Sequence, residues 1–347
     1  MVSVTIVTWN SEKYLRECFA ALAAQDYRDL EVTIVDNASE DGTRAILKTA
    51  DPAWRVIYND KNVGFAAGQN QAIRASRGNF VLCLNPDVML SPNFITQLMA
   101  AAGESCFDAG VFCGKLLRWD PAIENHKTNI IDSTGIYFTP NMRHLDRGAE
   151  EIDRGQYDRL QYVFGATGAA AFYRRSFIDD VSVEGEFFDE EFFAFREDGD
   201  LSWRGQLMGW KCLYLPTAVA WHVRRVTPER RKDLPLIINW HSAKNRFLMR
   251  GKNASGWLCW RLFFPVFWRD LMTFGYAALR DRRLLSAVTY WWKARESVRR
   301  KRHIIQSHRR VSDRELVWWF SNTPRAQDAP EPPPHSVLSS QQSAKRR

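Results

Sequence analysis

Residues 2–39 read VSVTIVTWNSEKYLRECFAALAAQDYRDLEVTIVDNAS, and this stretch decides the fold that we expect. Two apolar, β-branched runs, residues 2–8 and 31–35, have the composition of buried strands. The segment between them, residues 11–24, has the pattern of a helix. A strand, a helix of this length and a second strand form a right-handed crossover, which places the two strands parallel in one sheet. The sequence therefore predicts an α/β protein.

The same alternation continues through the next part of the chain. We expect helices at 40–49, 65–76 and 92–102 and strands at 55–58 and 79–84. Ser39 before the second helix and Ser91-Pro92 before the fourth are typical of helix starts. Repeated strand–helix units indicate a mostly parallel sheet that is flanked by helices.

Beyond residue 105 the alternation weakens. GVFCGKLLR and QYVFGATGAAAFYRR are expected to form strands, and the polar stretch 118–160 between them is predicted to be a loop over the functional site. A helix is expected to begin near Glu197. KCLYL and AVAWHV are predicted to be two strands that complete the globular part near residue 225.

Composition limits the class of protein. The chain has 347 residues, of which 45% are hydrophobic, enough for one large domain or for a domain with an appendage. The net charge of +8 is concentrated in residues 280–310, which hold eleven Lys or Arg and two acidic residues. Six cysteines without a C-x-x-C pair predict reduced thiols of a cytosolic protein, with neither disulfides nor zinc. Because the chain starts with a strand pattern and no basic leader, we expect that it is not exported.

Polar residues follow the first two predicted strands. Thr8 and Asn10 end the first, and Asp36 and Asn37 end the second. Ligands of open α/β sheets bind at the carboxyl ends of strands, where such side chains can bond a base and a ribose. Helix capping is the alternative, and we favour it for Ser39 alone. We interpret Asp36, which precedes the cap position, as a binding residue.

Two further motifs suit phosphate and metal chemistry. Gly64 and Gly68 in NVGFAAGQNQAI let backbone N–H groups approach a nucleotide or diphosphate, although glycines are common at helix starts. In LNPDV, Pro86 fixes a turn after a very apolar strand and leaves Asn85 and Asp87 pointing from its end. A carboxylate there suits Mg²⁺ or Mn²⁺, which commonly bridges protein carboxylates to substrate phosphates. A plain Asn-Pro-Asp turn is the alternative.

The most distinctive stretch is FFDEEFFAFREDGDLSWRGQLMGW, residues 187–210. Its carboxylates are crowded among phenylalanines, surroundings that raise a carboxyl pKa as a general base requires. Asp198 falls in the first turn of the predicted helix and faces the cleft. His222 ends a strand in AVAWHVRR and can contact a metal or phosphate, although a lone His is more often structural. Arg224 can pair with phosphate oxygens or simply be exposed.

Six motifs resemble those of the family 2 inverting glycosyltransferases, in the branch of the bacterial rhamnosyltransferases of cell-surface polysaccharide assembly. They are TIVTWNSEKYL, IVDNASEDGT, NVGFAAGQNQAI, LCLNPDV, FFDEEFFAFREDGDLSWR and LPTAVAWH. With HSAKNRFLM, the resemblance spans about residues 2–250. It implies a GT-A type α/β fold, a nucleotide-binding and mostly parallel sheet flanked by helices, followed here by a C-terminal amphipathic helical appendage.

The resemblance also implies roles for individual residues. Asp198 would be the catalytic base, and Asp87 and His222 would hold the divalent cation, Mg²⁺ or Mn²⁺. The family often has Asp at the position of Asn85, so this site would have one carboxylate fewer, as in the rhamnosyltransferase branch. The nucleotide-binding set is Thr8, Asn10, Asp36, Asn37, Gly64, Phe65, Gly68 and Asn85, and the acceptor-side set is Glu197, Gly168 and Trp203.

The implied reaction is the transfer of a sugar, L-rhamnose from dTDP-rhamnose, to a hydroxyl of a lipid-linked saccharide, with inversion. A diphosphate leaving group develops negative charge that a cation stabilises, and Asp198 removes the acceptor proton. Other classes stay open: another donor such as a UDP-sugar, a nucleotidyltransferase, or a non-enzymatic basic protein that binds membranes or nucleic acid. The acidic motifs have no role in that last class, so we expect no nucleic-acid partner.

The C-terminal part differs in composition from the rest. We divide the chain into a catalytic domain (1–235), a helical segment (236–320) and a disordered tail (321–347). Aromatic residues mixed with Arg between Trp257 and Trp292, followed by RRKRH, predict helices that lie in a membrane interface on anionic lipid, at the cytoplasmic face of the cell membrane. No run is apolar and long enough to span a bilayer. A helical hairpin packed on the domain, with Trp in its core, is the alternative.

Overall fold

A mixed sheet forms the centre of the computed structural model, which describes residues 1–103, 108–224, 236–280 and 285–330. The 11-stranded sheet has the order β13-β10-β12-β6-β11-β4-β1-β2-β3, with β5 paired to β12 and β7 to β6, and β8 and β9 form a separate pair. The strands are β1 (Val2–Thr8), β2 (Leu30–Asp36), β3 (Arg55–Tyr58), β4 (Phe80–Leu84), β5 (Val88–Leu90), β6 (Ala109–Trp119), β7 (Lys127–Ser133), β8 (Ile136–Phe138), β9 (His144–Asp146), β10 (Gln161–Val163), β11 (Ala170–Arg174), β12 (Lys211–His222) and β13 (Gln327–Asp328).

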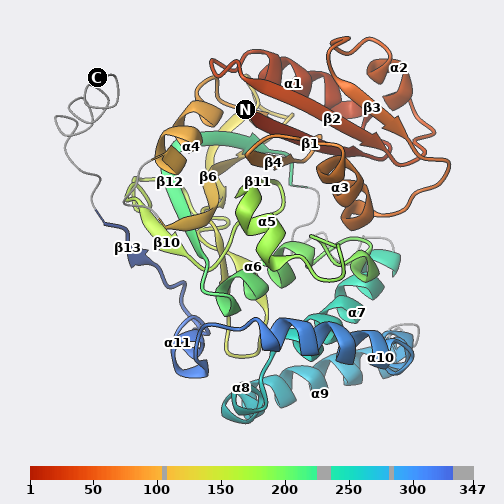
Figure 1. The fold of residues 1–347 in the computed structure, drawn as a ribbon, viewed down its shortest axis with the longest axis vertical. Coiled ribbons are helices and arrows are strands. Elements are labelled where there is room, and N and C mark those ends of the chain that lie inside the picture. The colour runs from red at the N-terminus through yellow and green to blue at the C-terminus, as the bar shows by residue number, and fades with distance from the viewer. Residues whose placement is uncertain (104–107, 225–235, 281–284, 331–347) are drawn as a thin grey trace, which may run out of the picture.

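Helices cover both faces of this sheet (Figure 1). In β1, Val4 and Ile6 face the core beneath α1, and Val7 faces α3 on the other side, as the strand alternation requires. The helices are α1 (Glu12–Ala23), α2 (Thr43–Leu47), α3 (Phe65–Arg74), α4 (Phe94–Gly103), α5 (Arg175–Val181), α6 (Glu197–Leu207), α7 (Leu236–Asn253), α8 (Gly256–Arg261), α9 (Phe263–Arg280), α10 (Leu285–Ser307) and α11 (Asp313–Val317), with a 3₁₀ turn η1 (Glu190–Phe192).

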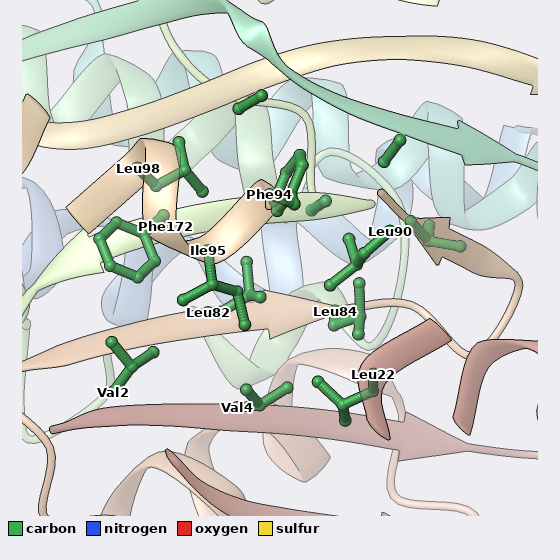
Figure 2. Packing of buried hydrophobic residues seen from close by; sticks show 14 of the residues in the cluster. Val2, Val4, Leu22, Leu82, Leu84, Leu90, Phe94, Ile95, Leu98 and Phe172 are labelled. Carbon is green, nitrogen blue, oxygen red and sulfur yellow. The ribbon is translucent and has the colours of Figure 1, made fainter. Parts of the chain in front are cut away.

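The main core fixes the edge of the sheet where the candidate site lies. Figure 2 shows it between β1, β4, β11 and helices α1 and α4; the labelled side chains are Val2, Val4, Leu22, Leu82, Leu84, Leu90, Phe94, Ile95, Leu98 and Phe172. Each such side chain contributes about 1.5–3 kcal/mol when it is buried. The parallel register of β1 with β2 and β4 then sets Thr8 beside Asp36 and places the end of β4 next to them.

The predicted elements of the first 103 residues are confirmed, with small differences at their ends. The largest difference is at the second helix, which begins after Gly42 instead of after Ser39. The Ser39 hydroxyl donates to the Asp36 carboxylate and does not cap a helix. The capping role that we favoured for Ser39 is therefore wrong.

The segment 118–160 is not a single loop. It contains β7, β8 and β9, and β7 pairs with β6 while β8 and β9 form a hairpin. Short strands without a helix between them give little periodicity, which explains why the pattern did not reveal them. The two strands expected from KCLYL and AVAWHV are one strand, β12, with an irregularity between Leu215 and Val219.

The C-terminal helices lie at one end of the molecule, against α6 (Figure 1). One core contains Trp203 and Leu207 of α6 together with Leu248 of α7 and Val298 of α10. The inner faces of α7 and α10 therefore support the alternative prediction, in which the C-terminal helices pack on the catalytic domain. Among the residues that the structure describes, no helix is both long and apolar enough to cross a membrane.

Part of the expected tail has regular structure. Gln327 and Asp328 form β13, which pairs with β10, and Ser321 N donates to the carbonyl of Phe138. The prediction of disorder from residue 321 onward is therefore wrong for residues 321–330. Residues 331–347 lie outside the described part of the chain.

We predict that Gly64→Ala lowers stability by about 1–3 kcal/mol, because Gly64 has φ +90° and an added Cβ would come within 2.6 Å of the Phe193 carbonyl oxygen and ring. Gly275→Ala is the matched control, because a Cβ on that exposed residue of α9 meets nothing within 4 Å. The control should be neutral or slightly stabilising. Urea denaturation of both variants measures the difference, and equal midpoints would contradict the prediction.

Candidate active site

The ends of β1 and β2 are joined through the Asp36 carboxylate. Asp36 is fully buried and accepts hydrogen bonds from the Thr8 hydroxyl (3.0 Å), the Ser39 hydroxyl (2.5 Å) and the Arg44 guanidinium (2.8 Å). Asn10 is exposed, and its side-chain oxygen accepts from the backbone of Glu40. Asp36 thus orders the rim of the site, while Asn10 and Arg44 reach solvent.

The glycines of the predicted motif NVGFAAGQNQAI allow close packing of α3 and also lie at its start. Asn37 donates to the Gly64 carbonyl at 3.0 Å, which ties the end of β2 to the start of α3. A Cβ on Gly68 would lie 3.0 Å from Val7, so this glycine lets α3 approach β1 closely. Phe65 is half-buried against Phe188. Gly64 and Phe65 lie at the rim with Asn37, and Gly68 lies behind them.

Asp87 and His222 meet because β5 pairs with the end of β12, which sets Val88 opposite His222. Asp87 Oδ1 lies 3.6 Å from His222 Nε2. The other ring nitrogen, Nδ1, lies 2.8 Å from Asp132 Oδ2. Asn85 completes the turn, with its N–H donating to the carbonyl of Ala169. Two predicted residues that are far apart in sequence are therefore adjacent here.

Asp132 is a site residue that the sequence did not reveal. It is buried, lies on β7, and accepts from Arg224 as well as contacting His222. Arg224 also pairs with Asp146 of β9. Despite burial, Asp132 and then Asp87 raise the pKa of His222 to about 10, so the ring is an imidazolium at neutral pH. The hint in the sequence was an acid directly after Ile130-Ile131, inside the segment that we took for a loop.

Asp198 lies in the first turn of α6, as predicted. Its Oδ2 accepts from the Gly168 N–H at 3.1 Å and its Oδ1 from the Gly199 N–H at 2.7 Å. Burial raises the pKa of Asp198, and burial together with Asp198 raises the pKa of Glu197 to about 8. Glu197 is therefore neutral at pH 7, and its carboxyl oxygen Oε2 is buried with no hydrogen-bond partner among the described residues.

Backbone contacts join this carboxylate to the Asp87 side of the site. Gly168, which bonds Asp198, is followed by Ala169, whose carbonyl accepts from Asn85. On the other side, His144 Nε2 lies 3.8 Å from Asp198 Oδ1. Burial, with a smaller contribution from Arg196, lowers the pKa of His144 to about 3, so this ring is neutral. The β8–β9 hairpin thus contributes both His144 and Asp146 to the site.

The segment before Asp198 has an unusual backbone that α7 holds in place. Phe193, Phe195 and Arg196 all have positive φ, which is costly for residues other than glycine. The buried Asn245 of α7 donates to the carbonyls of Phe192, Ala194 and Phe195. Arg196 donates to the backbone and hydroxyl of Ser242. The segment HSAKNRFLM, residues 241–249 of α7, therefore holds in place the peptide that carries Asp198.

Trp203 is not on the acceptor side. It is fully buried, and its ring lies 5.2 Å from that of Phe138 and 5.1 Å from that of Phe320. Helical spacing turns it away from Asp198 and into the core beneath α10. Its place in the acceptor-side set was wrong, whereas Gly168 and Glu197 lie beside the candidate base.

The geometry defines a class of protein: an α/β sheet whose strand ends gather acidic residues beside an imidazolium and a partly buried carboxylate of raised pKa. The family model "Glycosyl transferase family 2" matches residues 3–181. The chain belongs to that family and is a glycosyltransferase.

Individual proteins agree with this assignment. The chain is 26% identical over 296 residues to the N-acetylglucosaminyl-diphospho-decaprenol L-rhamnosyltransferase of Mycobacterium tuberculosis, covering 77% of this chain and 88% of the relative. It is 30% identical over 229 residues to an N-acetylglucosaminyltransferase of Mesorhizobium japonicum, covering 63% of this chain and half of that relative's length. The fold is similar to that of S. aureus TarS 1–349 in complex with UDP-GlcNAc, with TM-score 0.54, 15% identity and coverage of 88% and 90% of the two chains.

Asp132→Asn should lower the pKa of His222 toward the ordinary value near 6.5, because it removes the largest favourable interaction of the imidazolium. The raised pKa means that the ion pair stabilises the fold fully below pH 6.5 and that this contribution is lost as the pH rises through about 10. At pH 7 the variant should lose about 1–3 kcal/mol of stability, since two partly buried cations, His222 and Arg224, lose their buried partner. NMR titration of the ring and urea denaturation measure both effects. The exposed Asp60→Asn is the control, and an unchanged His222 titration would contradict the prediction.

Proposed function

We propose that the chain is an inverting sugar transferase that moves L-rhamnose from dTDP-rhamnose to a hydroxyl of a lipid-linked saccharide. The single observation that carries the proposal is the partly buried Asp198, a carboxylate of raised pKa whose neighbour Gly168 leads directly to the Asn85–Asp87 turn. A base for the acceptor and a site for the leaving group are thus adjacent. The M. tuberculosis relative, named as a rhamnosyltransferase, supports the choice of sugar.

The donor half of the site would lie at the ends of β1 and β2. Thr8, Asp36 and Asn37 are buried and hold one another and the start of α3, so they preorganise the pocket. The exposed Asn10 and the half-exposed Arg44 are then the groups that reach a nucleoside. A UDP-sugar is the alternative donor, because other relatives are named as N-acetylglucosaminyltransferases.

The residues around Asp87 fit a divalent cation. Asp87 offers an oxygen and His222 a nitrogen, and Asp132 on the opposite ring nitrogen directs Nε2 toward Asp87, a common support for a metal-bound histidine. Within the described ranges no cluster of three or more acidic, His or Cys side chains could hold a metal. Mg²⁺ or Mn²⁺ accepts few protein ligands when a diphosphate and water supply the others. The bound cation would neutralise charge on the leaving diphosphate, and it would have to displace the proton of His222.

The chain's own residues would carry the proton and the charge. Asp198 takes the proton of the acceptor hydroxyl as that oxygen forms its bond to the anomeric carbon. The bond from this carbon to the diphosphate oxygen breaks in the same displacement, with the electron pair leaving on the diphosphate. Because attack comes from the face opposite the leaving group, the anomeric centre is inverted without an enzyme nucleophile. Arg224 adds positive charge beside His222.

The outer face of α8 and α9 supports a membrane location for the acceptor. Trp260, Phe264 and Trp268 are 74%, 72% and 60% exposed at helical spacing, and Met272 and Leu279 continue the row. A row of this kind beside arginines is typical of helices that lie in a membrane interface. We propose that the protein binds the cytoplasmic membrane face through this row, on anionic lipid.

The base is tested by a pair of isosteric changes. Asp198→Asn should lower turnover by about 10³-fold or more, because no other carboxylate can take the acceptor proton. Glu197→Gln should keep most of the activity at pH 7, because its carboxyl is neutral below a pKa of about 8. Release of nucleoside diphosphate from dTDP-rhamnose, UDP-GlcNAc and related donors, with Mg²⁺ or Mn²⁺, is the measurement. Near-normal turnover of Asp198→Asn would exclude this residue as the base.

Membrane binding is tested by charge on the exposed row. Phe264→Glu and Trp268→Glu should each weaken binding to phosphatidylglycerol vesicles by about tenfold or more, because each replaces an exposed aromatic side chain that would enter the membrane interface with an acid. Ile152→Glu, a change at an exposed apolar residue of another part of the surface, should have little effect. Vesicle flotation measures the bound fraction. Equal losses in all three variants would count against the row as the membrane contact.

A further inference from the structure

An open groove of about 540 Å³ lies between α9 and the inner helices α7 and α10. α9 presents one face to it, at spacings of three and four residues. The apolar walls are Phe247, Phe263, Val266, Phe267, Phe274 and Trp291. A groove of this size is in the range of ligand sites. The described side chains leave it unfilled although aromatic residues line it on both sides.

One wall of the groove is polar and is formed by Arg250 and Asp270. Arg250 pairs with Asp270 at 2.7 Å, and the same carboxylate lies 3.2 Å from the guanidinium of Arg246. Arg250 Nη1 is buried and has no hydrogen-bond partner among the described residues. Apolar walls beside this guanidinium suit a ligand with an apolar chain and an anionic head.

The groove also approaches the candidate base. Met142, which lines it, lies in the turn of the β8–β9 hairpin. Two residues later in the same hairpin, His144 lies 3.8 Å from the Asp198 carboxylate. A head group bound near Met142 would place a saccharide attached to it close to that carboxylate.

The other walls lead to the exposed aromatic row. Phe263 and Phe267 line the groove and are 52% and 45% exposed, and their neighbours Phe264 and Trp268 belong to the row. An apolar chain can therefore pass from a membrane surface into the groove without crossing polar protein. Bulk phospholipid would cover the exposed row. Because the groove also contacts the β8–β9 hairpin beside the candidate base, we expect it to favour the lipid that carries the reacting saccharide.

We propose that this groove binds the phosphate-proximal part of the polyprenyl chain of a lipid-linked acceptor, with its phosphate near Arg250. The inference rests on the proposed function for the identity of the acceptor. It adds a lipid subsite in the C-terminal helices, so that these helices would select the acceptor as well as touch the membrane.

Cys259 offers a direct readout that needs no sugar transfer. It lines the groove and is exposed, whereas Cys18, Cys83, Cys113 and Cys212 are buried. In a full-length Cys106→Ser background, geranylgeranyl phosphate should slow maleimide labelling of Cys259 by about tenfold at saturation, as expected when a thiol is covered in nine-tenths of the molecules. Geranylgeraniol, which lacks the phosphate, should protect at higher concentration only.

Two variants and a matched control locate the effect. Val266→Trp fills the groove and should abolish protection, while Leu279→Trp, on the same helix but outside the groove, should retain it. Arg250→Gln should weaken protection by the phosphate by about tenfold, the size of one lost charge-assisted hydrogen bond, and leave that by the alcohol unchanged. The rate of labelling without lipid checks that each variant is folded.

Several outcomes would overturn the proposal. They are the absence of protection, equal protection in Val266→Trp, and protection by phosphatidylglycerol vesicles as effective as that by the prenyl phosphate. Protection that grows with protein concentration alone would assign the groove to a second copy of the chain. If Cys259 is protected but no donor supports transfer, the groove stands and the proposed function fails. If transfer to a lipid acceptor occurs without protection, the groove is excluded and the function stands.

Discussion

A buried carboxylate between two lysines is the interaction on which the arrangement of the site depends. Asp189 contacts Lys252 of α7 and Lys301 of α10, and all three side chains are at most 5% exposed. Lys252 also reaches Asp200 of α6, which the Arg204 guanidinium contacts as well. Charges removed from water cost several kcal/mol each unless they are paired. α7 and α10 can therefore dock on α6 only where these charges meet.

These ion pairs also constrain the position of the candidate base, Asp198. Asp189 begins the segment that ends at Asp198, and Asp200 follows Asp198 by two residues in α6, so the candidate base is held on both sides by paired carboxylates. The positive φ values between them need outside support, which Asn245 supplies by binding three carbonyls of the segment. Despite burial, both lysines lower the pKa of Asp189, whereas at Asp198 burial outweighs the backbone hydrogen bonds and Arg196 and raises the pKa. The paired structural acids thus differ from the candidate base.

The sequence predicted the N-terminal sheet because local patterns control it: strand alternation, helix periodicity and the turn at Pro86. It placed Asp87 near His222 correctly because strand ends in such sheets converge. It missed Asp132 and His144 because both lie in the segment 118–160, where β7, β8 and β9 follow one another without a helix between them and give little periodicity. It assigned Trp203 to the acceptor side from the motif that contains it, because nothing in the local pattern shows that Phe138 and Phe320 pack against this ring.

The C-terminal helices have two different faces, and each face fits one of the two interpretations of their sequence. Toward the sheet, Lys252 and Lys301 are buried ion-pair partners, which explains why a basic stretch need not be a solvated surface. Away from it, the row at Trp260, Phe264 and Trp268 has no covering element in the described structure. A single helix, α7, holds the peptide of the base with Asn245 and lines the groove with Phe247. If the groove binds the acceptor lipid as proposed, a lipid that moves α7 would also move Asp198, and acceptor binding would be coupled to the position of the candidate base.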